Sequence, residues 1–317
     1  MPVLLRSDLI EVEITPERGS DVRQFTDLVT GTPVLSVSPT AAAQVPRLAS
    51  PGTIIPALNG YPGGWQLHSP NCGPEREYQG VLLGFHGESS LAEWTVLAQT
   101  EASLSVETHL VTAPLKLTRA FSVAGASLTV TDTVTNLSPD PYETRLLQHP
   151  AFGDQFLDEH SFIATDASVL ITDADAPGTL ASAADAVGEP SALFIGGQPG
   201  VLPVPGSMSA QSLFGTLAGF TTPEATLYSP TRGFGMRLAW DASVFPYAWF
   251  WIEANHTPGW PWFRRMYAVA IEPSNVVAGG TGAVGSYQRG GNGRELAGGE
   301  TVTFTTTLTR VALRDAH

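Results

Sequence analysis

Hydrophobic and polar residues alternate along several stretches of the chain, and this period of two is typical of β-strands, in which successive side chains point to opposite faces. The pattern is clearest in four segments, residues 103–111, 115–123, 127–136 and 302–308. In the third of these, Leu128, Val130 and Val134 alternate with threonines and other polar residues. Because valine and threonine are favoured on a pleated, half-buried surface, local preference agrees with the pattern. We therefore predict β-strands in all four segments.

Helical periodicity is scarce by comparison. No window of about 12 residues or more keeps apolar positions at helical spacing without an interrupting glycine or proline. The 32 glycines and 25 prolines fit the turns between many short strands. The glycine-rich segment 279–299 is interpreted as a loop, because it lacks the lysine and the helical context of a phosphate-binding loop. The predicted fold class is all-β.

Length and composition favour one folding unit. The chain has 317 residues, of which 43% are hydrophobic and 15% are charged, so it can bury a large core without metal ions or disulfides. All-β domains reach this length as single units, and we predict one domain over residues 1–317. Cys72 is the only cysteine, which excludes an intrachain disulfide and a cysteine-rich zinc site.

Charge and hydropathy narrow the range of partners. The formal net charge of −14 argues against nucleic acids and anionic membrane surfaces, because both are bound by clustered lysines and arginines. The N-terminal segment does not read as a secretory signal, and no apolar stretch approaches the roughly 18 to 20 residues that span a bilayer. We expect a cytoplasmic protein that is a monomer or a homodimer.

Three short segments combine ionisable side chains with turn or aromatic residues, and they are residues 84–88, 148–153 and 270–274. In the first, Gly87 after His86 lets a ligand or another backbone come close, and Glu88 falls on the same face as His86 if the segment is extended. Taken alone, this histidine is better explained by a surface or core position.

The other two segments place ionisable residues at the ends of predicted strands. His149 follows the strand 142–148, and Pro150 should end regular pairing there because it has no N–H. Glu272 ends the apolar run 267–271, where a carboxylate pointing inward would need a partner or water. An exposed acid at a strand end is the alternative reading.

Aromatic residues crowd the region just before Glu272, at positions 249–251, 260, 262 and 263. Aromatic rings pack on the C–H faces of sugars, although some of these rings must simply fill the core. The intervening residues 255–259 form a predicted turn, so Trp260 and Trp262 should project from a loop beside the acid.

Taken in order, the three segments resemble the aldose 1-epimerase (galactose mutarotase) superfamily, in a divergent branch. The family's early His-Gly element, its central histidine and its late glutamate after an apolar strand match His86-Gly87, His149-Pro150-Ala151-Phe152 and Ile271-Glu272-Pro273. Residues 14–19, 27–31 and 296–300 also resemble the ends of the family's chains, so the resemblance covers nearly the whole sequence. The centre departs from the most familiar galactose mutarotases, which leaves the identity of the sugar open.

The resemblance implies a large twisted antiparallel β-sandwich, the galactose mutarotase-like supersandwich, with a sugar pocket on its concave face. It also implies an isomerase that interconverts the α and β anomers of a free sugar and requires no metal ion or other cofactor. Within that scheme Glu272 would be the catalytic base and His149 the acid, with His86 bound to the substrate near the reacting atoms. Further candidates for contacts with the sugar are Arg76, Glu88, Trp251 and Trp262.

Three alternatives remain open from the sequence. The substrate could be an anionic sugar, with Arg264 and Arg265 beside Trp262 as holders of a phosphate or sulfonate. The protein could bind carbohydrate without catalysis. It could also be a metal-dependent enzyme with His86, Glu88 and His149 as ligands.

Overall fold

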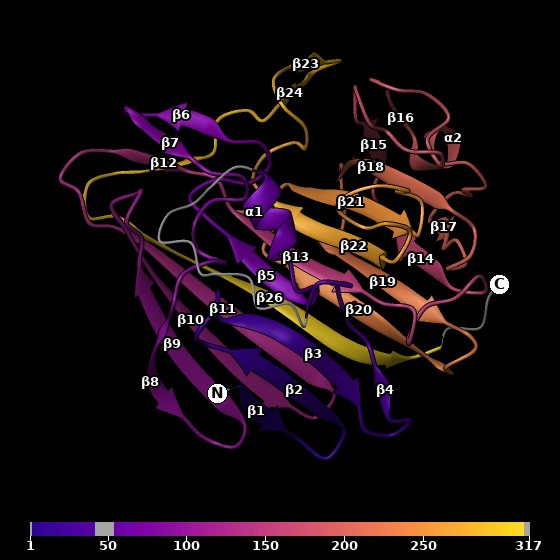
Figure 1. Cartoon of the computed structure of the whole chain (residues 1–317), viewed down its shortest axis with the longest axis horizontal. Coiled ribbons are helices and arrows are strands. Elements are labelled where there is room, and N and C mark those ends of the chain that lie inside the picture. The colour runs from indigo at the N-terminus through magenta and orange to yellow at the C-terminus, as the bar shows by residue number, and fades with distance from the viewer. Residues whose placement is uncertain (1, 42–53, 314–317) are drawn as a thin grey trace.

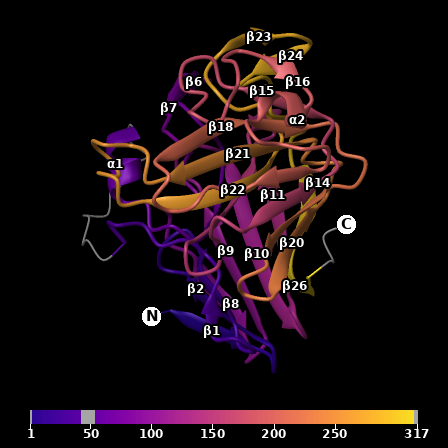
Figure 2. The same ribbon diagram turned by 90° about the vertical axis from the view of Figure 1, so that its right-hand side faces the viewer.

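The computed structural model of the chain describes residues 2–41 and 54–313. Within them, two large antiparallel sheets pack as a sandwich, and only two short helices accompany them, α1 (Ile54–Asn59) and α2 (Pro190–Leu193). The all-β prediction is confirmed, and the arrangement is the twisted sandwich that the resemblance implied. Figure 1 shows α1 in front of strands of one sheet, and Figure 2 shows it on the outer side of that sheet.

The larger sheet has 11 strands. Ten run in the order β1-β2-β3-β5-β13-β22-β21-β18-β15-β16, and β4 pairs with β3. Their bounds are β1 (Val3–Arg6), β2 (Ile10–Thr15), β3 (Asp21–Asp27), β4 (Thr32–Pro33), β5 (Trp65–His68), β13 (Leu147–Phe152), β15 (Val169–Thr172), β16 (Val187–Gly188), β18 (Gln211–Ala218), β21 (Tyr247–Ala254) and β22 (Tyr267–Ser274).

The second sheet has nine strands in the order β17-β14-β19-β20-β26-β11-β10-β9-β8. Their bounds are β8 (Thr95–Gln99), β9 (Ser103–His109), β10 (Leu115–Ala124), β11 (Ser127–Asn136), β14 (Phe162–Thr165), β17 (Val201–Pro203), β19 (Glu224–Ser229), β20 (Phe234–Trp240) and β26 (Thr301–Ala312). All four strands predicted from alternation lie here, as β9, β10, β11 and β26, and their buried and less buried residues alternate as expected.

Three two-stranded ribbons complete the fold: β6 (Arg76–Tyr78) with β7 (Val81–Leu83), β12 (Tyr142–Thr144) with β25 (Arg294–Leu296), and β23 (Gly282–Val284) with β24 (Tyr287–Arg289). The interpretation of 279–299 as a loop was therefore wrong, since β23, β24 and β25 fall within it. Each of these strands has only three residues, which is too short to show an alternating pattern within a glycine-rich segment. Both views place β6–β7 and β23–β24 toward the same end of the molecule (Figures 1 and 2).

The strand predicted at 142–148 is also corrected. It divides into β12, which pairs with β25 outside the large sheet, and β13, which continues through Pro150 to Phe152. Pro150 pairs with Trp65 of β5, whereas on the opposite side the pairing with β22 is interrupted between Leu147 and Ala151. The proline thus interrupts the pairing of β13 with β22 but not its pairing with β5, because the N–H of each residue points to only one side of a strand.

Candidate active site

His149 and Glu272 lie side by side on neighbouring strands of the large sheet. Leu147 of β13 pairs with Ser274 of β22, so two residues further along the register brings His149 opposite Glu272. On the far side of Glu272, β21 places Trp249 directly opposite it. Residues that face one another across strands share a face of the sheet, so these three side chains form a row.

Alternation along the strands turns this row away from the core between the sheets. Gln148 and Ile271, the immediate neighbours of His149 and Glu272, point inward: Gln148 hydrogen-bonds with Asp132 of the second sheet, and Ile271 belongs to the main hydrophobic core. The period of two then places His149 and Glu272 on the outer face. A slip of one residue in either strand would turn that strand's member of the pair into the core.

The pair is close and almost completely enclosed. Nε2 of His149 lies 3.5 Å from Oε1 of Glu272, and the two side chains are 9% and 1% exposed. Among the described residues, neither Oε1 of Glu272 nor Nδ1 of His149 has a hydrogen-bond partner. Buried polar atoms without hydrogen-bond partners call for an explanation, and here the two neighbouring side chains can bind a ligand or each other.

Burial shifts both groups toward their neutral forms. Desolvation raises the pKa of Glu272 to about 8 and lowers the pKa of His149 to about 4. At neutral pH the enclosed pair therefore favours a protonated carboxyl beside a neutral imidazole. The alternative, carboxylate beside imidazolium, contains the same single proton in a different place, so the pair as a whole holds one transferable proton in either form.

Two more histidines adjoin the pair. The rings of His68, which ends β5, and His86 stack with their centroids 4.2 Å apart, and the centroid of His149 lies 5.5 Å and 6.1 Å from them. Burial lowers the pKa of both His68 and His86 well below the usual value, so both rings are neutral. Nδ1 of His86 accepts a hydrogen bond from the N–H of Gly73, which leaves its Nε2 as the protonated nitrogen, able to donate.

Gly87 holds His86 in this place, as the sequence suggested. A Cβ at Gly87 would lie 2.5 Å from the carbonyl oxygen of Ser69, and its φ of +71° is unfavourable for other residues. We expect Gly87→Ala to lower stability by roughly 1–3 kcal/mol more than Gly80→Ala, because of overpacking. Gly80 is a matched control, since its φ is +78° and no atom lies within 4 Å of the position that a Cβ would take there.

Thermal melting of the two variants tests this expectation. Gly80→Ala should show only the strain of a left-handed alanine, about 1–2 kcal/mol. Equal effects for the two variants would mean that the approach to Ser69 does not constrain the His86 turn.

Aromatic rings wall the other side of the pair. Tyr61 lies edge-on to His149 at 5.6 Å between centroids, and it also contacts Trp251 and Trp262 at 6.3 Å and 5.8 Å. The ring of Trp251 lies 5.8 Å from that of His149. Trp251 and Trp262, the two tryptophans predicted to contact the sugar, are thus brought to the site. Trp260 is 42% exposed, and its indole N–H donates a hydrogen bond to Asn59.

The structure does not bring Glu88 to this group. Its carboxylate accepts hydrogen bonds from the N–H groups of Val111 and Thr112 and from the hydroxyl of Thr112, at 2.7 to 2.9 Å. Both oxygens are thereby engaged by the segment 111–112, so Glu88 secures that loop and is no longer a candidate for contact with the sugar.

Arg76 lies at the opening of β6, three residues after Gly73. Its guanidinium stacks over Tyr78 at 4.8 Å from the ring centroid and is 3.1 Å from a carboxylate oxygen of Glu143. In the described part of the chain, no ion pair joins it to Glu272. The contacts of Arg76 are thus with its own ribbon and with β12.

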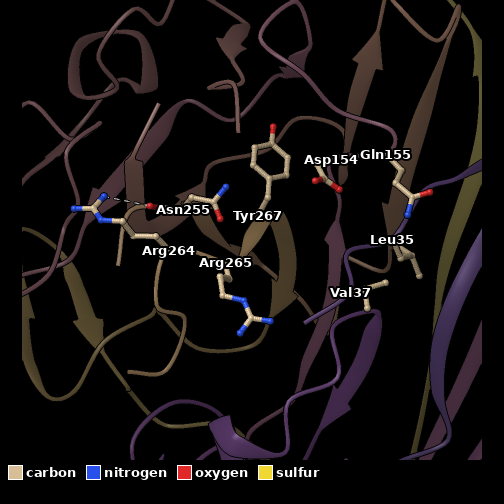
Figure 3. Close-up of a pocket in the computed structure, with 8 residues that line it drawn as sticks. All are labelled: Leu35, Val37, Asp154, Gln155, Asn255, Arg264, Arg265 and Tyr267. Carbon is tan, nitrogen blue, oxygen red and sulfur yellow. Dashed lines mark hydrogen bonds between the residues drawn. The ribbon is translucent and has the colours of Figure 1, made fainter. Parts of the chain in front are cut away.

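Two cavities differ in size and in chemistry. The larger, about 300 Å³, is lined by Leu35, Val37, Asp154, Gln155, Asn255, Arg264, Arg265 and Tyr267 (Figure 3). None of these residues belongs to the group around His149 and Glu272. The smaller, about 30 Å³, is lined partly by Tyr61, His68 and His86 and therefore touches the ionisable cluster. We assign the candidate active site to the group around His149 and Glu272 because of its ionisable side chains, since the volume of a cavity does not by itself indicate a reaction.

The structure separates Arg264 and Arg265 from the acid. Both side chains are exposed and line the larger cavity, and Nη1 of Arg264 donates to the backbone oxygen of Asn255 (Figure 3). Within residues 2–41 and 54–313, no group of three or more histidine, cysteine, aspartate or glutamate side chains is arranged to hold a metal ion. No helix in the same part of the chain is long and apolar enough to cross a membrane.

Sequence reasoning missed two members of the site, Tyr61 and His68. A signal for His68 exists, since it lies two residues after Gln66, which pairs with His149, and so shares that face of the sheet. Tyr61 follows α1 without any repeating pattern, and only the tertiary structure brings its ring to His149.

Comparison with known structures supports the fold over the full chain. A galactose mutarotase-like protein from Lactobacillus casei has a TM-score of 0.70 and 16% identity, with 98% of this chain and 100% of that chain covered. A galactose mutarotase related enzyme from Lactobacillus acidophilus has a TM-score of 0.69 and 17% identity, with 99% of each chain covered. A galactose mutarotase-like protein from Clostridium acetobutylicum has a TM-score of 0.67 and 14% identity, with 98% and 95% covered.

The fold is therefore galactose mutarotase-like, as the resemblance implied. No curated protein matches the sequence. Residues 3–309 match the family described as a domain of unknown function, DUF4432. Because that match spans nearly the whole chain, the protein belongs to the DUF4432 family.

Proposed function

We propose that the protein is an aldose 1-epimerase-like enzyme that interconverts the α and β anomers of a free sugar. The observation that carries the proposal is the buried His149–Glu272 pair, with 3.5 Å between Nε2 and Oε1. Among the described residues, each of the two side chains also has a polar atom without a hydrogen-bond partner. Binding a sugar does not by itself require an acid and a base at this distance, whereas mutarotation requires both.

The reaction needs one proton acceptor and one proton donor. A base removes the proton from the anomeric hydroxyl while an acid protonates the ring oxygen, the bond from the anomeric carbon to the ring oxygen breaks, and an open-chain aldehyde forms. After rotation about the bond next to the aldehyde, the reverse transfers close the ring on the other face. The single proton that His149 and Glu272 hold between them supplies one acid and one base in either of its two positions.

The two positions of the proton correspond to two assignments of roles. The resemblance assigns the base to Glu272 and the acid to His149, which requires the charged form of the pair. The enclosed environment favours the neutral form, in which Glu272 donates and His149 accepts. His86, which accepts at Nδ1 and so carries its proton on Nε2, would hold a sugar oxygen near the pair. The lining of the cavity beside His68 and His86 must open to admit a sugar ring, because it has room for about one water molecule.

The proposal is tested by following freshly dissolved α-anomers of several aldoses, neutral and anionic, by polarimetry or NMR. We expect acceleration above the spontaneous rate in proportion to enzyme concentration, and a loss of about 100-fold or more in His149→Asn. Saturable sugar binding without acceleration of any sugar would instead favour a carbohydrate-binding protein of the same fold.

The pH dependence of kcat/KM checks the assignment of the pair. Activity requires one proton on the pair, so kcat/KM should be level between about pH 4 and about pH 8, the values to which burial moves the pKa of His149 and of Glu272. Below this window the pair gains a second proton and lacks a base; above it the pair loses its proton and lacks an acid. A single inflection near pH 6.5 would mean that His149 titrates as an ordinary exposed histidine.

A further inference from the structure

Two arginines, Arg76 of β6 and Arg145 between β12 and β13, share one carboxylate. Nη1 of Arg76 is 3.1 Å from Oε1 of Glu143, and Nε of Arg145 is 4.0 Å from the same oxygen. The side chains of Arg76 and Arg145 are only 16% and 12% exposed. Two positive charges and one negative charge leave this enclosed cluster with a net positive charge.

Within the described part of the chain, the guanidinium groups also keep donors that make no hydrogen bond, and Oε1 of Glu143 beside them makes none either. Nε and Nη2 of Arg76 and Nε of Arg145 are buried and have no hydrogen-bond partner among the described residues. Nη2 of Arg145 donates to the backbone oxygen of Gly290, beside β24. Charged donors that are buried without acceptors are costly, and each such group calls for an explanation. Burial, and then the like charge of Arg76, lowers the pKa of Arg145, an effect that a bound anion would reverse.

Cys72 links this cluster to the catalytic pair. Its buried thiol packs in one cluster with Leu147 and Trp249, the latter directly opposite Glu272. Burial raises the pKa of this thiol, the charges of Arg145 and Arg76 lower it and that of Glu272 raises it, so the two arginines and the catalytic carboxylate all lie near the thiol.

Chain geometry limits the separation of the two centres. Arg145 precedes His149 by four residues, which places their Cα atoms at most about 14 Å apart. The long arginine side chain spans part of this distance. This bound is compatible with a sugar whose anomeric centre lies on His149 and whose opposite end meets the guanidinium groups.

We propose that Arg76 and Arg145 form an oxyanion subsite of the active site, and that the preferred substrate is an aldose with a negatively charged group remote from its anomeric carbon. Phosphate, sulfonate and carboxylate share the oxygen acceptors that a guanidinium recognises. The inference rests on the mutarotase-like activity proposed above. It moves the anion site from Arg264 and Arg265, which line a separate cavity, to the arginines next to Cys72.

The test compares the mutarotation of glucose, glucuronate and glucose 6-phosphate by NMR exchange. We expect kcat/KM to be at least about 10-fold higher for an anionic sugar than for glucose, and this ratio to fall about 10- to 100-fold in Arg145→Gln and in Arg76→Gln, mainly through KM. Arg145→Lys, which keeps the charge, should recover part of the ratio. Glucuronate and glucose 6-phosphate distinguish a carboxylate from a phosphate.

Arg264→Gln is the matched control, because Arg264 lies on the larger cavity and its loss should leave the ratio at the wild-type value. A ratio that falls in Arg264→Gln but not in Arg145→Gln would overturn the proposal, and so would a wild-type enzyme with no preference for the anionic sugars. Melting curves of each variant separate loss of binding from loss of the fold.

If no sugar is accelerated, the proposed activity fails but the subsite is still tested. Inorganic phosphate and sulfate are then titrated into the wild-type protein and Arg145→Gln, with binding followed by calorimetry. Saturable binding that Arg145→Gln weakens at least about 10-fold supports the oxyanion subsite, because a bidentate contact to an anion is lost. Absence of binding, or equal binding by both proteins, overturns it.

Discussion

Glu272→Gln is expected to lower the turnover of mutarotation by about 100-fold or more and, in the same protein, to raise the melting temperature at pH 8. The loss of activity follows because glutamine can neither accept nor release the proton that the pair must transfer. The gain in stability follows because Glu272 is 1% exposed and Oε1 has no hydrogen-bond partner among the described residues.

The sign of the stability effect follows from proton linkage. Burial raises the pKa of Glu272 from 4.5 to about 8, so between these values the folded protein keeps the proton that the unfolded chain releases. The free energy of unfolding therefore falls as the pH rises from about 4.5 to 8, by up to about 4 kcal/mol at pH 8. A neutral glutamine removes this dependence, so the stabilisation by Glu272→Gln should be largest at pH 8 and should vanish near pH 4.5.

Glu253 supplies a matched control on the neighbouring strand β21. It is also buried, but its carboxylate accepts hydrogen bonds from the N–H groups of His256 and Thr257 and from the hydroxyl of Thr257. Glu253→Gln should therefore destabilise the protein, by roughly 1–3 kcal/mol, because an amide replaces a carboxylate that was fully engaged. Melting curves from pH 4.5 to 8.5 measure both variants, and a lower melting temperature for Glu272→Gln at pH 8 would contradict an unpaired, buried carboxyl at position 272.

Asp132→Asn is expected to destabilise the fold by about 3–5 kcal/mol, because it leaves Arg119 as a buried charge without its counterion. Nε of Arg119 lies 2.8 Å from Oδ1 of Asp132, and the two side chains are 0% and 1% exposed. Oδ2 of Asp132 accepts from Gln148, whose side-chain oxygen accepts from Trp65 of β5. This network ties the two sheets together directly behind His149.

The double variant Arg119→Leu/Asp132→Leu separates charge from structure. Removing both charges should restore much of the stability lost in Asp132→Asn, since well-packed apolar residues can replace a buried ion pair. Glu224→Gln is the exposed counterpart: Glu224 lies 4.0 Å from Arg237 with both side chains partly exposed, and its loss should cost less than about 1 kcal/mol. Urea denaturation measures all three, and similar effects for Asp132→Asn and Glu224→Gln would show that the inter-sheet network is not needed.

The same network has a signal in the sequence that the prediction of strands alone did not use. On the alternating face of 115–123 the position between Leu117 and Phe121 is Arg119, and on that of 127–136 the position between Val130 and Val134 is Asp132. Each charge interrupts an apolar face, and the register of β10 and β11 sets them directly opposite one another. Two interruptions in neighbouring predicted strands indicate a buried ion pair.

The sequence by itself determined the all-β class, the four long strands of the second sheet and the identity of the pair, His149 and Glu272. These follow from local rules, because alternation fixes which side chains share a face and resemblance compares residues in chain order. The single-domain organisation and the catalytic roles stay predictions.

Only the tertiary structure decided which residues surround the pair. It brought Tyr61 and His68 to His149, turned Glu88 toward the segment 111–112, and separated Arg264 from the acid. The physical reason is that these contacts depend on turns and on pairings between strands distant in sequence, which no local periodicity encodes. The tertiary structure also decided how deeply the pair is buried. The roles that the resemblance assigned, Glu272 as base and His149 as acid, require oppositely charged side chains. The enclosure of His149 and Glu272 instead favours the neutral form of the pair.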